Sequence, residues 1–208
     1  MYKYQLWSLI LIPIVGCSLG NGPDKDKSSP IPIDYCEKAK KVPASVKVGT
    51  GSTSFVDIDE TSVLTPDTAG QGGHHIWTSV KATGLNPGQG EMIVQDSGID
   101  GGYNYAATAV GDDPVLLTVE ITFPDSTLGP YAVSYETFLD GNTENSSLSG
   151  ITAILNVWAI MEHFEDQESV KASLFVSIKD SCGTIVTDRK EITIGLVGVP
   201  GLYGTGYG

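Results

Sequence analysis

The sequence predicts an all-β fold, an antiparallel β-sandwich that occupies residues 41–197. Three observations predict it. Apolar and polar residues alternate through several short segments, Gly, Pro, Asn and Asp separate those segments, and Thr, Ser, Val and Gly are abundant. Alternation with a period of two places every second side chain on one face of a strand. β-branched residues favour strands, and Gly and Pro favour the turns between them.

The clearest predicted strand covers residues 115–123. It is apolar on one face and polar on the other, as in a strand of an antiparallel sheet with one buried face. Leu116 is the exception, because it falls among the polar positions. Residues 131–137 repeat the pattern. The inward-facing set of the first strand is Val115, Leu117, Val119, Ile121 and Phe123.

Other strands follow in order along the chain. Residues 74–85 form the longest of them, with Ile76 and Val80 on one face and Trp77 and Lys81 on the other. Asn86-Pro87-Gly88 predicts a turn after it. The remaining predicted strands are at residues 46–48, 54–58, 62–64, 91–95, 103–110, 171–179 and 191–196.

Residues 148–161 fit two structures. Ile151, Ala153 and Leu155 fit a strand buried on both faces, whereas Leu148, Ile151, Leu155 and Trp158 fit the apolar stripe of a helix. The abundance of Ile, Thr and Val, and the neighbouring strands, favour the strand.

Residues 1–17 have the pattern of an export signal. Lys3 supplies positive charge, and an apolar run from Leu6 to Val15 follows it. That run is shorter than the roughly 20 residues of a membrane helix, as in the hydrophobic region of a signal peptide. The closing residues Ile14-Val15-Gly16-Cys17 resemble the lipobox of bacterial lipoproteins, in which the Cys is lipidated and becomes the N-terminus.

That resemblance implies a lipoprotein signal peptide over residues 1–16 and lipidation of Cys17. The alternative is an ordinary signal peptide followed by a free thiol. Residues 17–40 are interpreted as a lipidated tether, and residues 18–32, rich in Gly, Pro and Ser, as its flexible part. Ser18 is not Asp, which in lipoproteins of diderm bacteria implies transfer to the outer membrane. The Gly-rich tail, residues 198–208, has no core-forming pattern and is predicted to be disordered.

The chain is acidic, with a formal net charge of −13. Removal of the signal peptide takes away Lys3 and no acidic residue, which leaves −14. Such a field repels phosphate backbones and anionic lipid head groups. Nucleic acid is therefore not an expected partner, and membrane attachment must come from the N-terminal lipid. We expect the protein in the cell envelope, at the outer membrane, facing the periplasm or the surface.

Two of the three cysteines remain once Cys17 is assigned to lipidation. Cys36 and Cys182 form an even pair in an exported, oxidising setting, so we predict a disulfide between them. The alternative is two unpaired, partly buried thiols.

Residues 164–194 carry a second resemblance. Their alternating apolar residues, the turn Asp180-x-x-Gly183, Asp188 and a closing strand look like the final hairpin of bacterial immunoglobulin-like domains. The segment Gly70–Trp77 (GQGGHHIW) also looks like a segment of uncharacterised bacterial lipoproteins of this type. The resemblance implies an immunoglobulin-like β-sandwich and no established activity.

His74 and His75 are candidate binding residues. Neighbours on a strand face opposite sides, so the two cannot easily share one metal. A zinc or copper site would need a further ligand, such as His163, Met92 or a carboxylate. The alternative is that one His caps a turn while the other packs beside Trp77.

Aromatic and acidic residues supply further candidates. Trp77, Tyr103 and Tyr105, together with Trp158, could form a stacking surface for a glycan or a protein partner, or could pack within the core. A group of loop acids could ligate calcium or could simply be solvated. Those acids are Asp96, Asp100, Asp112, Asp113, Asp57, Asp59 and Glu60.

Catalytic motifs are missing from the sequence: it has no Gly-x-Ser-x-Gly elbow, His-Glu-x-x-His helix or phosphate-binding Gly-Lys-Thr. We therefore expect a non-enzymatic, lipid-anchored envelope protein that binds or has a structural role, with no cofactor and no bound metal. Two alternatives stay open. One is a glycan-binding module, with or without calcium, and the other is a metal-handling protein that uses His74 or His75.

Overall fold

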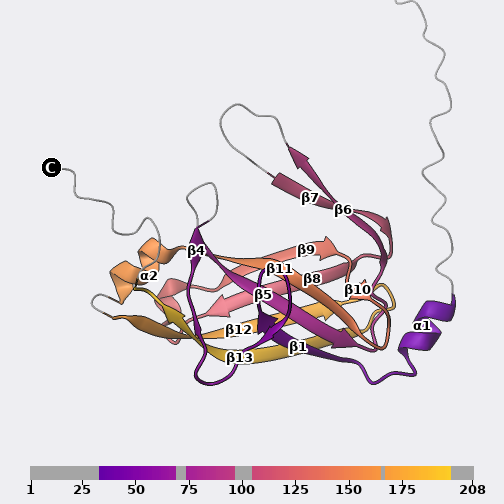
Figure 1. Cartoon of the computed structure of the whole chain (residues 1–208), viewed down its shortest axis with the longest axis horizontal. Helices are drawn as coiled ribbons and strands as arrows, with labels where there is room; N and C mark the ends of the chain where they lie inside the picture. The colour runs from indigo at the N-terminus through magenta and orange to yellow at the C-terminus, as the bar shows by residue number, and fades with distance from the viewer. Residues whose placement is uncertain (1–32, 69–73, 97–104, 165–166, 198–208) are drawn as a thin grey trace, which may run out of the picture. The chain divides into compact units, whose positions relative to one another are not determined.

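The computed structural model describes residues 33–68, 74–96, 105–164 and 167–197, all of them within the unit Ile31–Gly208 (Figure 1). Two β-sheets and a separate hairpin make up most of this part of the chain. The predicted signal peptide, Cys17, the first part of the predicted tether and the tail at 198–208 lie outside the described residues.

The first sheet has six strands, mostly short at its edges. Its order is β10-β11-β5-β1-β2, and β4 pairs with β5 outside this path. All of these pairs are antiparallel. The strands are β1 (Ser45–Thr50), β2 (Val56–Asp57), β4 (Asp67–Thr68), β5 (His74–Thr83), β10 (Asp140–Gly141) and β11 (Ser146–Leu155).

The second sheet has five strands in the order β3-β13-β12-β8-β9. β3 pairs with β13 in parallel, and the other pairs are antiparallel. The prediction of an all-β, mainly antiparallel fold is therefore confirmed. The strands are β3 (Val63–Leu64), β8 (Val115–Thr122), β9 (Tyr131–Thr137), β12 (Ser169–Lys179) and β13 (Ile185–Gly195).

Alternate residues from both sheets meet in one core. Val80 of the first sheet and Leu174 of the second are fully buried in the same apolar cluster. The inward set predicted for β8 is buried, whereas Leu116, the predicted exception, is 43% exposed. Burying one such aliphatic side chain contributes about 1.5–3 kcal/mol, so this common core holds the sheets face to face.

A polar contact also joins the sheets at one edge. The Asp188 carboxylate on β13 accepts a hydrogen bond from the backbone N–H of Val48 on β1, at 2.8 Å. Because β2 pairs only with Gly49 and Thr50 of β1, the Val48 N–H has no strand partner on that side, and the Asp188 carboxylate satisfies it.

The ambiguous segment contains a strand and then a helix. β11 ends at Leu155, and helix α2 (Val157–His163) begins after Asn156. The Asn156 side chain accepts from Ala159 N at 3.2 Å, which caps the helix. The prediction of a strand across all of residues 148–161 is therefore wrong beyond Leu155, because the cap starts a helix whose Val157 and Ile160 complete the core.

A second helix lies where the tether was predicted to end. Helix α1 (Ile33–Ala39) lies within the segment 17–40, after residues 18–32, for which flexibility is predicted. The helix is held by a disulfide between Cys36 and Cys182, with Cα atoms 5.6 Å apart, and by the burial of Ala39. The predicted disulfide is present. No helix within the described ranges, including the short 3-10 helix η1 (Ser126–Leu128), is long and apolar enough to cross a membrane.

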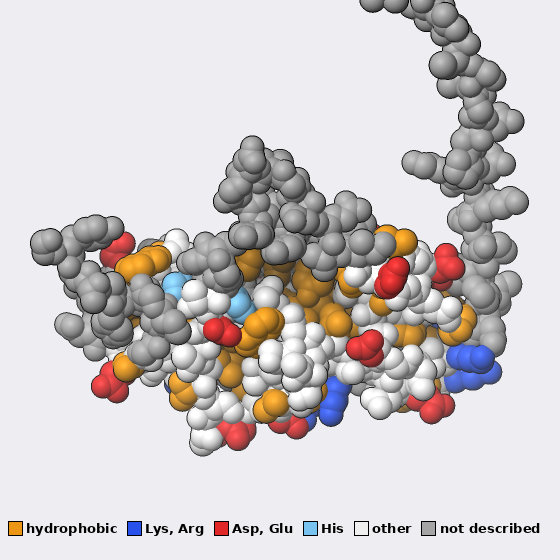
Figure 2. Space-filling model, turned by 45° about the horizontal axis from the view of Figure 1, so that its top comes forward, with side chains coloured by type: hydrophobic (Ala, Val, Ile, Leu, Met, Phe, Trp, Pro, Cys, Tyr) orange, Lys and Arg blue, Asp and Glu red, His pale blue; other side chains and the backbone are white. Residues whose placement is uncertain are grey.

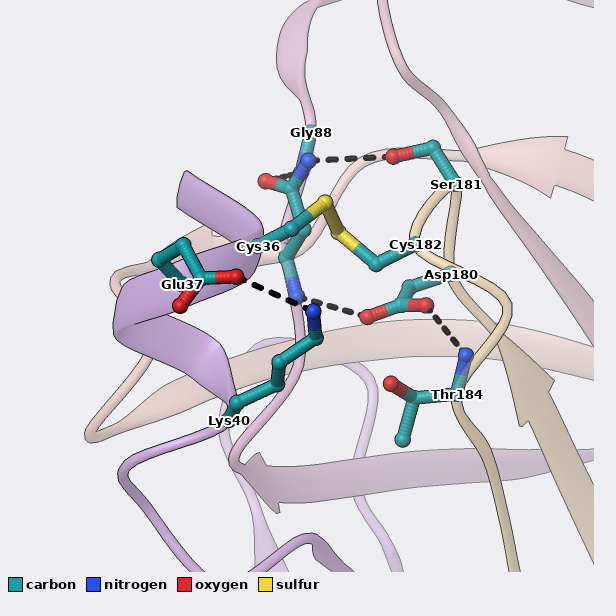
Figure 3. The surroundings of a disulfide bond; sticks show 9 residues. Cys36, Glu37, Lys40, Gly88, Asp180, Ser181, Cys182 and Thr184 are labelled. Carbon is teal, nitrogen blue, oxygen red and sulfur yellow. Dashed lines mark hydrogen bonds and ion pairs between the residues drawn. A yellow bond between two sulfur atoms is a disulfide. The ribbon is translucent and has the colours of Figure 1, made fainter. Parts of the chain in front are cut away.

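The turn that carries Cys182 is fixed by a buried carboxylate. Asp180 is only 3% exposed and accepts from the backbone N–H groups of Asn86 and Thr184, at 2.9 and 2.7 Å (Figure 3). Two N–H donors compensate for removing this carboxylate from water. The β12–β13 turn, the segment after β5 and α1 are therefore tied together at one end of the sheets.

The separate hairpin consists of β6 (Gln89–Asp96) and β7 (Tyr105–Asp112), paired over their full length. It is inserted between β5 and β8 and projects from the two sheets (Figure 1). Gln89 Nε2 hydrogen-bonds the Tyr35 hydroxyl of α1, which connects the base of the hairpin to the disulfide-bonded end.

We predict that losing the disulfide destabilises the fold strongly. The bond joins residues 146 apart in sequence, and the chain-entropy model assigns such a cross-link up to about 4–5 kcal/mol. The Cys36→Ser/Cys182→Ser double variant should therefore unfold at clearly lower urea concentration than the parent. Reductant should lower the midpoint of the parent and leave that of the double variant unchanged. An unchanged parent midpoint on reduction would contradict this.

Candidate functional site

Two of the predicted binding residues lie together on the outer face of β5. The rings of His75 and Trp77 meet edge to face, with centroids 4.4 Å apart. Trp77 Nε1 donates to the Asp67 carboxylate of β4 at 3.1 Å. His74 pairs with Leu155, and His75 pairs with the exposed Ile154, so strand alternation directs the two imidazoles to opposite faces.

This arrangement does not assemble a metal site. Among the described residues, no three His, Cys, Asp or Glu side chains come close enough to hold an ion. His75 is 6% exposed, and its Nε2 atom has no hydrogen-bond partner. Burial lowers the pKa of His75, and the charge of Asp67 opposes that change in part. A neutral His75 that packs beside Trp77 accounts for this geometry.

The other predicted residues are dispersed. Tyr105 begins β7, and Tyr103 lies outside the described residues. Trp158 is on α2 and 58% exposed. Asp96 and Asp112 lie at opposite ends of the β6–β7 hairpin, paired with Tyr105 and Gln89 respectively. Seven residue-to-residue steps along the strand, about 23 Å, separate the two backbone positions, which is too far for these two acids to share one calcium ion.

A different feature of the same face is a loop that crosses β5. The chain leaves β1 at Thr50, whose carbonyl accepts from the Ser79 hydroxyl at 2.5 Å. The next carbonyl, of Gly51, accepts from Gly150 N on β11 at 3.2 Å. Because β5 lies between β1 and β11, residues 51–55 must pass over the outer face of β5. They cover Ser79, which is fully buried.

This crossing loop forms one wall of a groove, which we call the Lys81 groove. Residues 52–55 line one side, Lys81 of β5 lies within it, and Asp140, Ser147 and Ser149 of β10 and β11 line the other. Its volume is about 510 Å³. Small-molecule sites in proteins typically measure about 300–1,000 Å³, so one or two sugar-sized units would fit. Most of its lining side chains carry hydroxyl or charged groups.

The register of the sheet places the charged residues of the groove in one row. Asp140 pairs with Ser147, Ser147 with Lys81, and Lys81 with Lys47. Strands are spaced about 4.8 Å apart, so the Asp140 and Lys81 backbones lie about 10 Å apart, with a hydroxyl between them. The groove therefore offers an acceptor, a hydroxyl and a cationic donor along one line.

Lys81 is oriented by an aromatic ring. Its Nζ lies 4.6 Å from the ring centroid of Phe55, a cation–π contact. Lys47, directly opposite, forms an ion pair with Asp57 at 2.6 Å. The Phe55 ring and the Asp57 carboxylate offset the electrostatic repulsion between the two facing lysines. In the described part of the chain, no carboxylate lies within ion-pair distance of Lys81 Nζ.

Two glycines allow the crossing loop to lie close to β1 and β11. A Cβ at Gly49 would meet the Phe55 ring at 2.7 Å, and one at Gly150 would meet the Ser52 carbonyl oxygen at 2.7 Å. Gly150 has φ of +73° and lies where β11 shifts register between Leu148 and Ile151. Such bulges redirect side chains at functional positions, and here the bulge contains Ser149 of the groove.

We predict that the fit of the loop against Gly150 can be measured with a matched control. Gly129 also has positive φ, +61°, but a Cβ there would meet nothing within 4 Å. Gly129→Ala should cost about 1–2 kcal/mol of unfolding free energy, from the backbone conformation alone. Gly150→Ala should cost at least about 1 kcal/mol more, from the clash with Ser52. Equal losses in urea denaturation would show that the loop does not pack there.

We predict a pH dependence of stability that originates at His75. Its pKa is lowered from the ordinary value of 6.5, so below 6.5 the unfolded chain binds a proton that the folded chain does not. The free energy of unfolding contributed by this group should therefore fall as pH drops from 6.5 through the folded pKa. His75→Phe should reduce the difference in stability between about pH 7.5 and about pH 5.5. Ring-proton NMR that shows His75 titrating at or above 6.5 would contradict this.

Comparison of the chain with known proteins does not identify a family for it. No family model, curated protein or solved structure matches the chain. The interpretation of the site therefore depends on the residues of the outer sheet face themselves.

Proposed function

We propose that this protein is a lipid-anchored, non-enzymatic binding protein of the cell envelope, and that it binds its ligand on the outer face of the six-stranded sheet. The observation that carries the proposal is the Lys81 groove. A loop crosses a sheet face, two glycines allow it to lie close to that face, and the result is a polar concavity. Binding sites on strands are positioned more accurately than sites on loops alone.

The folded part is proposed to be an immunoglobulin-like sandwich. The orders β10-β11-β5-β1 and β13-β12-β8-β9 correspond to strands D-E-B-A and G-F-C-C′ of that fold. The β12–β13 hairpin is then the final F–G hairpin, in agreement with the resemblance of residues 164–194. Two features depart from antibody domains: the β6–β7 insertion between B and C, and a disulfide that joins α1 to the F–G turn.

The anchor is proposed from the N-terminal sequence. An apolar run of signal-peptide length precedes Cys17, and the residues around it resemble a lipobox. Figure 2 shows acidic side chains scattered over the face that it displays, in keeping with the net charge of −13. A surface of this charge gains little from anionic head groups, so acyl chains would supply the attachment, at about 0.8 kcal/mol per buried CH2.

We predict that Cys17 carries the lipid. In bacteria grown with labelled palmitate, the parent protein should be labelled and should sediment with membranes. Cys17→Ser should lose the label and move to the soluble fraction, whereas the control Ser18→Ala should keep both properties. A parent without label, or a Cys17→Ser variant that keeps it, would refute the anchor.

A further inference from the structure

We propose that the Lys81 groove binds a saccharide unit that carries a carboxylate, such as a uronic acid. This inference depends on the proposed binding function and names the ligand class for it. It assigns a role to Phe55, Lys81, Ser147 and Asp140, none of which belongs to the His75–Trp77 pair.

The lining of the groove suits a ligand with many hydroxyl groups. Hydroxyl side chains come from both walls, from residues 52–54 on the loop and from Ser147 and Ser149 on β11. Each hydroxyl can donate one hydrogen bond and accept others, and the Asp140 carboxylate is an acceptor only. A sugar presents adjacent hydroxyls that match such a set, and its ring is shorter than the roughly 10 Å between the Asp140 and Lys81 backbones.

Lys81 specifies the acidic group. Its ammonium is a donor only, and the Phe55 ring holds it without using its capacity to donate hydrogen bonds. No described carboxylate pairs with it. A ligand carboxylate at this end of the row would form a charge-assisted hydrogen bond, and the ligand hydroxyls would then point toward Ser147 and Asp140. At the other end of the row, Asp140 would repel an acidic group. This repulsion fixes the orientation of the saccharide unit in the groove.

Phe55 does not serve as a stacking surface for the sugar. One side of that ring lies against Gly49, and Lys81 lies over the ring. Phe55 therefore orients the lysine, and polar contacts of the other lining residues would bind the ligand. This differs from the aromatic stacking surface that the sequence predicts.

The test is calorimetric binding with the full-length protein in detergent micelles. Disaccharides of one uronic acid and one neutral sugar, which carry a single carboxylate, are the acidic probes, and the corresponding neutral disaccharides are the neutral probes. We expect at least one acidic probe to bind, and the neutral probes to bind at least about tenfold more weakly. That factor corresponds to the loss of one hydrogen bond to a charged group.

Variants assign the binding to the groove. Lys81→Gln, which removes the charged donor, should weaken binding of the acidic probe by about tenfold or more. Asp140→Ala, which removes the acceptor for the ligand hydroxyls, should also weaken it. Lys47→Gln is the matched control, because Lys47 is opposite Lys81 in the same row but does not line the groove, and it should leave the affinity unchanged. Unchanged thermal midpoints would show that all three variants are folded.

Three results would overturn the inference. They are failure of every acidic probe to bind, equal binding of neutral and acidic probes, and unchanged affinity in Lys81→Gln. None of these three results bears on the lipid anchor, which palmitate labelling tests, or on the proposed sandwich fold. Loss of labelling at Cys17 would in turn leave the saccharide measurement valid, so the two proposals can fail separately.

Discussion

The packing of two sheets through alternate side chains is the constraint on which the rest of the structure depends. Val80 and Leu174 are fully buried because every second residue of β5 and β12 faces the opposite sheet. A slip of one residue would expose these side chains and bury Lys81 instead. The core therefore fixes the register, and the register fixes which side chains share the outer row. The order Asp140, Ser147, Lys81 and Lys47 follows from hydrophobic packing on the other face of the sheet.

The two ends of the sheets differ in how they are held. At one end, the disulfide, the buried Asp180 and α1 join segments distant in sequence, and the inserted hairpin begins there. At the other end, α2 covers the core with Val157 and Ile160. The Lys81 groove lies on the outer face of the sheet toward the disulfide-bonded end, since Lys81 is two residues before the end of β5 and Asp140 follows Leu139, whose N–H donates to the Pro87 carbonyl. Its walls are a bulged strand and a loop bonded to it, so little ordering would accompany binding.

Strand positions could be predicted from the sequence because alternation reports directly on burial. Residues 131–137 and 171–179 are strands almost to the residue, and the turn at Asp180–Gly183 is correct. The helices were harder to predict. α1 owes its position to a disulfide with a residue 146 positions away, and α2 depends on the Asn156 cap within an apolar stretch that also fits a strand. The groove could not be predicted, because it arises from pairing between β1, β5 and β11. The sequence predicts a strand at 54–58 that would include Phe55, whereas β2 is only Val56–Asp57.

The central claim is that residues 51–55 cross β5 and place Phe55 against Lys81. Proton NMR of the folded protein tests it most directly. We expect the ε-methylene protons of Lys81 to be shifted upfield by the Phe55 ring, with NOEs between the two side chains. The Gly150 amide should exchange slowly with deuterium, because it donates to Gly51. Random-coil shifts for Lys81, absence of those NOEs and rapid exchange at Gly150 would contradict the account.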